Sequence, residues 1–285
     1  MATLDTILHK ESLSSTPESV NVLENYYEAV GGKGLIAAMA LQYSSAQSIL
    51  ISMVAARSKI RGACAGRIPE SSLIPVLTRD HRTWITIDGS QRSVTYVGLG
   101  KIRRESLDSH RDDILAAVDA CDVVYLSTED RWLIGTVLAH LAHTEVPLVT
   151  NLCLPLLQVL GNRVAVRDVI ARSAVLLMNE FESQYALKTL GVDSWHSAIS
   201  PMLREVVVTR GGDGGVYSHY PFDSWSAYEA VQPSIVRCAV GAGDTFNGAY
   251  VARRFGAGDG VLDSCLAAAD LAALKVAQEG TSLVW

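Results

Sequence analysis

An acid follows a flexible stretch of backbone near the carboxyl end of the chain, at Gly241, Ala242, Gly243 and Asp244, just before the helical sequence TFNGAYVARRF. The free N–H groups and partial positive charge of a helix N-terminus can bind an anion such as a phosphate. Asp244 can accept a proton from an attacking hydroxyl while these amides stabilise a transferring phosphoryl group. A simpler interpretation is also open, because an acid in a first turn stabilises the helix dipole by about 0.3–1 kcal/mol.

Two further glycine-rich stretches have the same ambiguity. In GGKGLIAAMALQ, Gly32 and Lys33 run into an alanine-rich helix, where Lys33 can hydrogen-bond a polar substrate or simply follow a tight turn. In VVVTRGGDGG, an expected strand ends at Thr209 and Gly211 follows it. This pattern indicates either a hairpin with a flexible tip or a bare backbone against which a nucleotide lies at the carboxyl end of a strand.

Short alternating strands and helices must position these residues. Buried β-branched runs separated by amphipathic helices predict a mainly parallel sheet with helices on both faces. The expected strands are residues 122–127, 146–151, 172–179 and 204–210, and the expected helices are 108–121 with Asp108 as N-cap, 131–143, and 180–190, which Gly191 ends. The sequence RTWITIDGSQRSVTYVG, residues 82–98, instead indicates a β-hairpin attached to the α/β body.

The composition excludes several classes of protein. The chain has 285 residues, 49% hydrophobic residues and a net charge of -6, so a sizeable core is expected and a basic surface for nucleic acid or anionic membranes is not. The five cysteines form no C-x-x-C pair, and no basic leader or 20-residue apolar run is present, which predicts a soluble, cytoplasmic protein. Neither the G-x-G-x-x-G of dinucleotide-dependent oxidoreductases nor the H-E-x-x-H of metallohydrolases occurs.

Four motifs, taken in order, resemble those of the ribokinase family, also called the PfkB carbohydrate kinase family. They are GGKGLIAAMAL, NEFE (Asn179–Glu182), VVVTRGGDGG and VGAGDTFNGAY, and together they extend over nearly the whole chain. The resemblance implies one α/β domain over residues 1–285. It also implies a ribokinase-like three-layer α/β/α sandwich with a mainly parallel sheet and a small β-strand lid, formed from about residues 6–30 and 82–104.

The resemblance further implies an ATP- and Mg²⁺-dependent kinase acting on a hydroxyl of a sugar or nucleoside. Asp244 would be the general base, and Gly241, Ala242 and Gly243 would form the anion hole. The nucleotide side would comprise Asn179, Glu182, Thr209 and Gly211, with Glu182 acting on Mg²⁺ through water. Asn179 and Glu182 can alternatively serve only to cap the helix that follows them.

On the acceptor side, the resemblance implies Asp5, Gly32, Lys33 and Glu129 as substrate-binding residues. The alternatives are that Asp5 is a solvated terminal residue and that Glu129 is an ordinary loop acid. No nucleic acid or membrane partner is expected. The lid is a candidate surface for a homodimer.

Three departures from the family pattern qualify these expectations. Ile36 replaces an asparagine that relatives direct at the sugar, which leaves the acceptor open. Cys238 replaces an aspartate of the monovalent-cation site, so potassium activation is not assumed. In the family, several apolar residues of a first strand normally precede Asp5. Their lack here predicts either that the start is truncated or that the sheet lacks part of a central strand. A missing central strand would expose the apolar side chains and unpaired backbone groups of its neighbours. These departures keep a second hypothesis open, a non-catalytic relative that binds nucleotide or sugar as a regulator.

Overall fold

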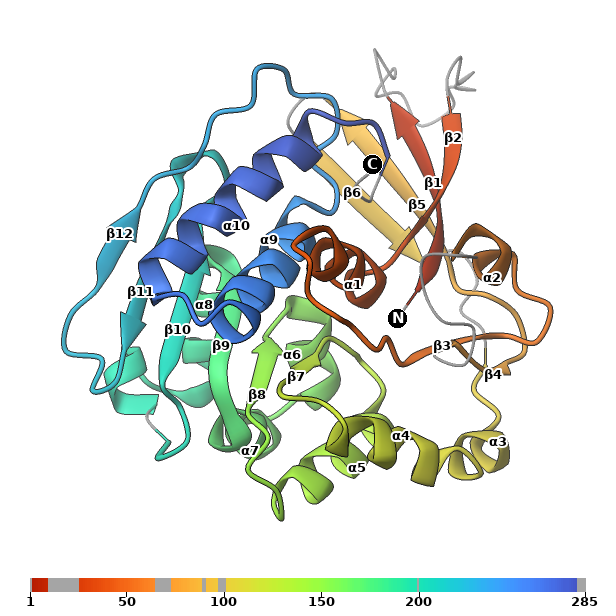
Figure 1. The fold of residues 1–285 in the computed structure, drawn as a ribbon, viewed down its shortest axis with the longest axis horizontal. Helices are drawn as coiled ribbons and strands as arrows, with labels where there is room; N and C mark the ends of the chain where they lie inside the picture. Colours follow the sequence, from red (N-terminus) through yellow and green to blue (C-terminus); the bar gives the residue numbers. More distant parts are fainter. Residues whose placement is uncertain are drawn as a thin grey trace.

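The computed structural model describes residues 2–9, 26–64, 73–88, 91–96, 101–198 and 200–280. Within these ranges, the largest sheet has six strands in the order β12–β11–β10–β9–β8–β7 (Figure 1). Strands β7 to β10 are parallel, whereas β11 and β12 are antiparallel to their neighbours. The strands are β7 Val124–Leu126, β8 Leu148–Asn151, β9 Ser173–Asn179, β10 Glu205–Thr209, β11 Gly215–His219 and β12 Ser226–Tyr228.

Helices cover both faces of this sheet, as the alternation of strand and helix predicts. Leu177 and Val207 pack in one hydrophobic cluster with α1, α9 and α10, whereas their chain neighbours Leu176 and Val206 pack in another with α6, α7 and α8. Successive side chains of a strand point to opposite faces, so the sheet is the middle of three layers. The helices are α1 Lys33–Tyr43, α9 Ala242–Val251, α10 Val261–Val276, α6 Leu154–Leu160, α7 Arg163–Arg172 and α8 Glu180–Leu190.

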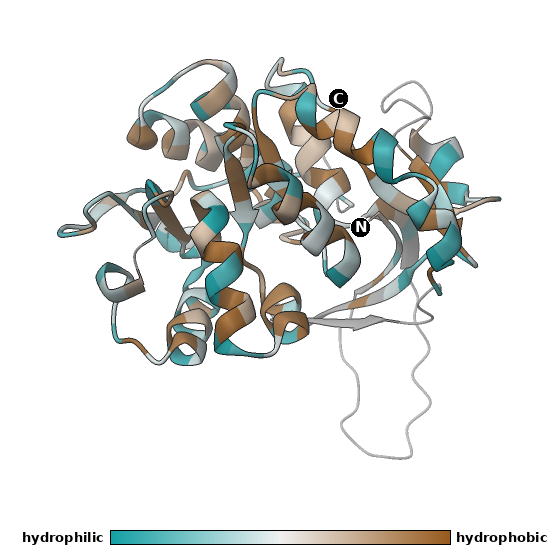
Figure 2. Cartoon of the chain, turned by 90° about the horizontal axis from the view of Figure 1, so that it is seen from below, coloured by the Kyte–Doolittle hydropathy of each residue, from teal (hydrophilic) through white to brown (hydrophobic). Residues whose placement is uncertain are grey.

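Figure 2 shows helices of the molecule that carry both hydrophobic and hydrophilic residues. Local signals fix several of their ends: Asn162 caps α7 by accepting from the Ala165 N–H, and Gly191 ends α8 in the left-handed conformation. The expectation that Asp108 caps a helix over 108–121 is wrong. Asp108 instead ends the short helix α3 (Arg104–Asp108), and α4 (Arg111–Asp119) begins after His110.

A separate pair of parallel strands, β3 (Ser52–Ala55) and β4 (Leu73–Leu77), lies beyond β7 (Figure 1). In the described part of the chain, β7 pairs with β8 and β3 pairs with β4, but β7 and β3 do not pair with each other. Helices α2 (Lys59–Cys64), α3, α4 and α5 (Arg131–Leu141) accompany this region. The expected interruption of the central sheet is therefore present between β3 and β7.

A four-stranded sheet of order β2–β1–β5–β6 stands beside the α/β body (Figure 1). The predicted hairpin is confirmed, because β5 and β6 are antiparallel with Asp88 opposite Gln91. Ile7 and Ile85 of this sheet pack against Cys238 and Val240, which lead to the GAGD sequence. The strands are β1 Thr3–His9, β2 Tyr26–Gly31, β5 Arg82–Asp88 and β6 Gln91–Tyr96. Residues 10–25, 89–90 and 97–100, which belong to the lid expected at about 6–30 and 82–104, lie outside the described residues.

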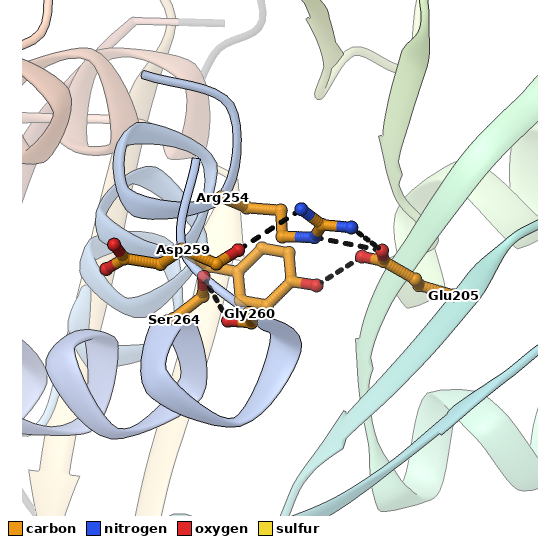
Figure 3. Close-up of polar contacts among 6 residues, drawn as sticks. Glu205, Arg254, Asp259, Gly260 and Ser264 are labelled. Carbon is orange, nitrogen blue, oxygen red and sulfur yellow. Dashed lines mark hydrogen bonds and ion pairs between the residues drawn. The ribbon is translucent and has the colours of Figure 1, made fainter. Parts of the chain in front are cut away.

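The far end of α9 is fixed to the start of β10 by a partly buried polar network (Figure 3). The guanidinium of Arg254, in the π-helical turn Ala252–Gly256, donates to Glu205 from Nε at 2.9 Å and from Nη2 at 2.6 Å. Tyr250 donates to the other Glu205 oxygen at 2.6 Å. This network holds α9 on the sheet, so that its opposite end, with Asp244, is also held in place.

None of the helices in the described part of the chain is long and apolar enough to cross a membrane.

Candidate active site

Asp244 is the third residue of α9, and its side chain is half-buried. Gly241 precedes the helix in the left-handed conformation, with φ of 83°, which a glycine adopts without strain. The first helical hydrogen bond joins the Thr245 N–H to the Gly241 carbonyl at 2.8 Å. The earlier amides of the turn therefore lie at an open helix N-terminus, although the Ala242 N–H makes a long 3.3 Å contact with the Ala239 carbonyl. A side chain at Gly243 would meet no atom within 4 Å, so the space above this backbone is open.

Close packing of α1 on α9 brings two of the glycine-rich stretches into one region. A Cβ atom at Gly248 would lie 2.2 Å from the Ala37 carbonyl oxygen, so the two helix backbones meet where Gly248 is. Gly32 is the N-cap of α1, with φ of 98°, and Lys33 is its first residue. Ile36, in place of the family's asparagine, is 3% exposed and packs inside the protein.

Polar residues occur at the carboxyl ends of four adjacent parallel strands. Asn151, Asn179 and Thr209 are the last residues of β8, β9 and β10, and Ser127 directly follows β7. Asn179 and Thr209 are paired in register, and Asn151 donates to the Ser127 hydroxyl at 3.3 Å. In open α/β sheets, ligands bind outside this edge.

Lys33 and Glu129 form an ion pair that joins the start of α1 to the loop after β7. The two side chains are 24% and 16% exposed, so Glu129 is not an ordinary solvated loop acid. Burial by itself raises the pKa of Glu129, but the charge and hydrogen bond of Lys33 act together with other positive charge and backbone hydrogen bonding to hold the pKa below its usual value. The pair therefore presents a fixed positive and a fixed negative charge.

Asn179 and Glu182 form a reciprocal cap at the start of α8. The Asn179 side chain accepts from the Glu182 N–H, and Glu182 Oε2 accepts from the Asn179 N–H, both at 2.9 Å. Glu182 Oε1 also accepts from the Leu154 N–H at 3.0 Å, which ties α8 to the start of α6. The two residues therefore do cap the helix, and each Glu182 oxygen keeps a further lone pair for water.

The glycine-rich stretch after Thr209 is a hairpin turn between β10 and β11, as one of the two interpretations predicted. Gly211 adopts φ of 60° in a short 3₁₀ turn, and a Cβ at Gly214 would lie 2.2 Å from the Tyr228 carbonyl oxygen. Gly214 is therefore needed for packing against β12. Gly211 is exposed, and a Cβ there would meet no atom within 4 Å.

Asp5 is buried in the four-stranded sheet, with 4% exposure, and is not a solvated terminal residue. Thr3 donates to its Oδ1 at 2.6 Å, and Thr83 donates to the same oxygen. Burial raises the pKa of Asp5, although the two hydroxyl donors oppose this shift. Among the described residues, no hydrogen-bond donor to Oδ2 is found, so this oxygen can accept a further hydrogen bond.

Several polar residues of the site carry no sequence signature. Asn247 donates to the Tyr125 hydroxyl at 3.2 Å, and this contact joins α9 to β7. Burial raises the pKa of Tyr125, and the nearby charge of Asp244 raises it further, which places Asp244 close to the strand. Burial raises the pKa of the Cys153 thiol to about 11, and the fields of Lys33 and Glu129 also act on it. The Asn247–Tyr125 contact therefore connects the helix that carries Asp244 to the end of β7.

The segment that leads into the GAGD sequence is anchored to the end of α10. The Lys275 ammonium is fully buried and donates to the Cys238 carbonyl at 2.9 Å. The N–H groups of Arg237 and Cys238 donate to the Val276 carbonyl at 2.9 and 3.1 Å. Burial lowers the pKa of Lys275. The buried Lys275 ammonium thus contacts Cys238, the residue that replaces the aspartate of the family pattern.

The comparisons with known proteins agree with this fold. Of the solved structures, a Burkholderia thailandensis nucleoside kinase in complex with inosine matches 98% of this chain and 90% of its own, with a TM-score of 0.80 and 16% identity. A Methanocaldococcus jannaschii nucleoside kinase, an archaeal member of the ribokinase family, matches with a TM-score of 0.79, 17% identity and the same coverage. A Cryptococcus neoformans ribokinase in complex with ADP has a TM-score of 0.73, 16% identity and coverage of 98% and 93%. A search of curated protein sequences found no match.

These structural matches define the class: the chain has the ribokinase fold, an α/β sandwich with a mostly parallel sheet. The family model described as pfkB family carbohydrate kinase matches residues 2–285. The chain therefore belongs to the PfkB family of carbohydrate kinases, as the four motifs indicated.

Proposed function

We propose that this protein transfers the γ-phosphate of ATP to a hydroxyl of a sugar or nucleoside, with Asp244 as general base. The observation that carries the proposal is the position of Asp244. It lies in the first turn of α9, behind the left-handed Gly241 and beside the open backbone of Gly243. An acceptor hydroxyl bound there can lose its proton to Asp244 while the helix N-terminus stabilises the charge on the phosphoryl group.

The acceptor would lie between the lid sheet and the Lys33–Glu129 pair. Asp5 offers Oδ2 to one hydroxyl, and the ion pair offers both a donor and an acceptor to others. The inosine complex of the Burkholderia relative supports a nucleoside as one candidate acceptor, and the ribokinase relatives support a sugar. The nucleotide would lie along the carboxyl edge of the sheet, near Asn179, Thr209 and Gly211.

Mg²⁺ fits this site only as an ion held mainly by the nucleotide. Among the described residues, no group of three or more His, Cys, Asp or Glu side chains can hold a metal ion. Mg²⁺ in kinases commonly keeps several waters and binds substrate phosphates, and it would neutralise charge on those phosphates. Glu182 can accept hydrogen bonds from such waters with its remaining lone pairs. A monovalent cation is not part of the proposal, because Lys275 already places a positive charge at Cys238.

The test is ADP release measured against a panel of sugars and nucleosides, with Asp244→Asn as the variant. Asp263→Asn is the matched control, because Asp263 occupies the same third position of α10 and is exposed. Both variants lose a favourable charge near a helix N-terminus, but only Asp244→Asn removes the base. We expect a loss of turnover of about 10²- to 10⁴-fold in Asp244→Asn, with ATP affinity retained, and no loss in Asp263→Asn. Wild-type turnover in Asp244→Asn would contradict the proposed role.

One observation favours a second candidate function, a regulator that binds nucleotide or sugar without turnover. Ile36 offers no hydrogen bond where relatives have an asparagine, and it is buried. The same panel separates the two functions. A kinase releases ADP with at least one acceptor, whereas a regulator binds a nucleotide or sugar in calorimetry and releases none.

A further inference from the structure

Exposed positive charge gathers around β3 and β4, although the whole chain carries a net charge of -6. The residues come from three segments, one after β3, one after β4 and one before α3. They are Arg57, Lys59, Arg79, Lys101, Arg103 and Arg104, which are all exposed. We call these six residues the basic surface. Figure 1 shows the elements that carry it, α2, β3, β4 and α3, on one side of the molecule.

Backbone contacts hold the three segments of the basic surface side by side. Strands β3 and β4 are parallel and paired, so the segments that follow them leave the same edge. Asp80, which follows Arg79, accepts from the Lys59 N–H at 3.1 Å. On the other side of β4, the Thr78 N–H donates to the Lys101 carbonyl at 3.0 Å. The six positive groups therefore belong to one continuous part of the molecule.

The charge of the basic surface is little neutralised by the protein. Arg104 contacts Asp130, with 3.8 Å between Nη1 and Oδ1, and the other five members make no ion pair with a described residue. Asp80 is buried and already accepts from the Ser58 hydroxyl and from backbone N–H groups. In segments 55–60, 78–81 and 101–105, Glu105 is the one exposed acid. Repulsion among like charges falls when an anion binds between them, so an anionic ligand fits this surface.

The basic surface lies on the acceptor side of the proposed active site. Asp130, the partner of Arg104, directly follows Glu129, which pairs with Lys33. The nucleotide would lie at the ends of β9 and β10, and β8 and β7 separate those strands from the β3–β4 pair. An anion at the basic surface is therefore better placed to belong to the acceptor than to ATP.

We propose that the acceptor is a phosphorylated sugar, whose phosphate binds to the basic surface while a free hydroxyl of the same molecule lies at Asp244. The inference rests on the proposed kinase function and names the class of its acceptor. The phosphate on the sugar is not transferred, and the γ-phosphate of ATP goes to the free hydroxyl. An arginine guanidinium donates two parallel hydrogen bonds to phosphate oxygens, and a positive surface attracts a dianion before contact.

The first test compares sugars with their own monophosphates in the ADP-release assay. The pairs are ribose with ribose 5-phosphate and fructose with fructose 6-phosphate. We expect kcat/KM to be about 100-fold higher for the phosphorylated member of at least one pair, an effect that one or two charge-assisted hydrogen bonds supply. The KM of that member should also rise as NaCl is added, because salt screens the exposed charges, whereas the KM of the neutral sugar should not.

The second test removes two charges from the basic surface. In Arg103→Gln/Arg104→Gln we expect the KM of the phosphorylated sugar to rise about 10- to 100-fold, with kcat, Tm and the KM of the neutral sugar unchanged. A purely structural role would instead lower kcat or Tm for both sugars. The control is Arg167→Gln/Arg172→Gln, which changes the net charge equally at two exposed arginines of α7. Arg57→Gln/Lys59→Gln tests the other part of the surface in the same way.

The outcomes separate this inference from the proposed function. If ADP is released with neutral sugars and phosphorylation brings no gain, the kinase stands and the inference is overturned. A gain that both basic-surface variants leave intact also overturns it, because the phosphate then binds elsewhere.

If ADP is released with no acceptor, the kinase function fails, and calorimetry with the same phosphorylated sugars decides on the site. Binding that weakens about tenfold in Arg103→Gln/Arg104→Gln, but not in the control, keeps the basic surface as a phosphate site. Absence of binding overturns it. Fluorescence anisotropy with a labelled single-stranded oligonucleotide is measured alongside: if that probe binds through the same arginines and the phosphorylated sugars do not, the surface belongs to nucleic acid and the inference is wrong.

Discussion

The Lys275 ammonium donates a 2.9 Å hydrogen bond to the Cys238 carbonyl, and both residues are buried. Three residues after Cys238, Gly241 turns the chain into α9 and positions Asp244. Cys238 also packs against Ile7 of the lid sheet. One buried cation therefore lies where the four-stranded sheet, the turn at Gly241 and the end of α10 meet.

Lys275→Met tests whether this contact positions the turn. Replacing a buried charge by an apolar side chain of similar length is often neutral or favourable for stability, so we expect Tm to change little. Turnover should fall by about 10- to 100-fold, because displacement of a catalytic segment by even 1 Å costs that much. The control is Lys188→Met, an exposed lysine in the last turn of α8, which should leave turnover unchanged. Normal turnover in Lys275→Met would contradict the positioning role.

Gly248→Ala tests the contact that brings α1 and α9 together. The added Cβ would lie 2.2 Å from the Ala37 carbonyl oxygen, so the helices must move apart. We expect a loss of unfolding free energy of about 1–3 kcal/mol, the usual cost of overpacking, together with lower turnover. Gly135→Ala is the control: Gly135 is exposed within α5 and a Cβ there meets no atom within 4 Å. That variant should gain about 0.5–1 kcal/mol, because alanine favours helices over glycine. Urea denaturation of both variants measures the difference.

Glu182→Gln separates the capping role of Glu182 from its proposed action on Mg²⁺. Glutamine keeps one acceptor oxygen but cannot accept from both the Asn179 and Leu154 N–H groups. We expect about 1 kcal/mol lower stability and a higher Mg²⁺ concentration for half-maximal turnover. Glu180→Gln is the control, because Glu180 begins the same helix and contacts only the exposed Arg210 among the hydrogen bonds and ion pairs of the described residues. If both variants need the same Mg²⁺ concentration, Glu182 acts only as a cap.

The sequence predicts the carboxyl-terminal half of the fold well because its signals are local. Helix 180–190 is found with its bounds intact, since the Asn179–Glu182 cap and Gly191 mark its ends. The strand expected at 172–179 is β9 to within one residue, because it is a continuous buried run before that cap. The hydrophobic pattern of the sequence predicts no helix or strand between the strands expected at 146–151 and 172–179, although α6 and α7 lie there. There, apolar residues follow one another closely and only Gly161 and Asn162 separate the two helices.

The candidate site could be found only where glycines or caps mark it. Tyr125 and Asn151 are single polar residues at strand ends, and nothing in their spacing distinguishes them from packing residues. Lys275 and Cys238 are 37 residues apart in the sequence, so no local sequence pattern predicts their contact. The interruption of the sheet between β3 and β7 was expected from the departure from the family pattern before Asp5. The cavity between β3 and β7, which residues of α1, α9, α4 and α5 line, depends on helix packing that the sequence does not display.

Asp5 gives a prediction for the pH dependence of stability. Burial raises its pKa in the folded protein above the ordinary value of 3.8, so between these two pKa values the folded state binds more protons than the unfolded state. The contribution of Asp5 to the free energy of unfolding is therefore lowest above its folded pKa, where the buried carboxylate is charged. It rises as the pH falls through that pKa toward 3.8.

Asp5→Asn removes this titration and keeps an oxygen that accepts from Thr3 and Thr83. Its new N–H groups add an offset to the stability that does not change with pH. We therefore expect the wild type to gain stability relative to Asp5→Asn as the pH is lowered from 7 to 4, in urea denaturation at each pH. Asp263 is exposed, so the wild type should show no such gain relative to Asp263→Asn when that variant is measured in the same way. If the difference in unfolding free energy between wild type and Asp5→Asn stays constant with pH, the Asp5 carboxylate is not held in a desolvated site. The buried acceptor site that we assign to Asp5 would then lose its physical basis.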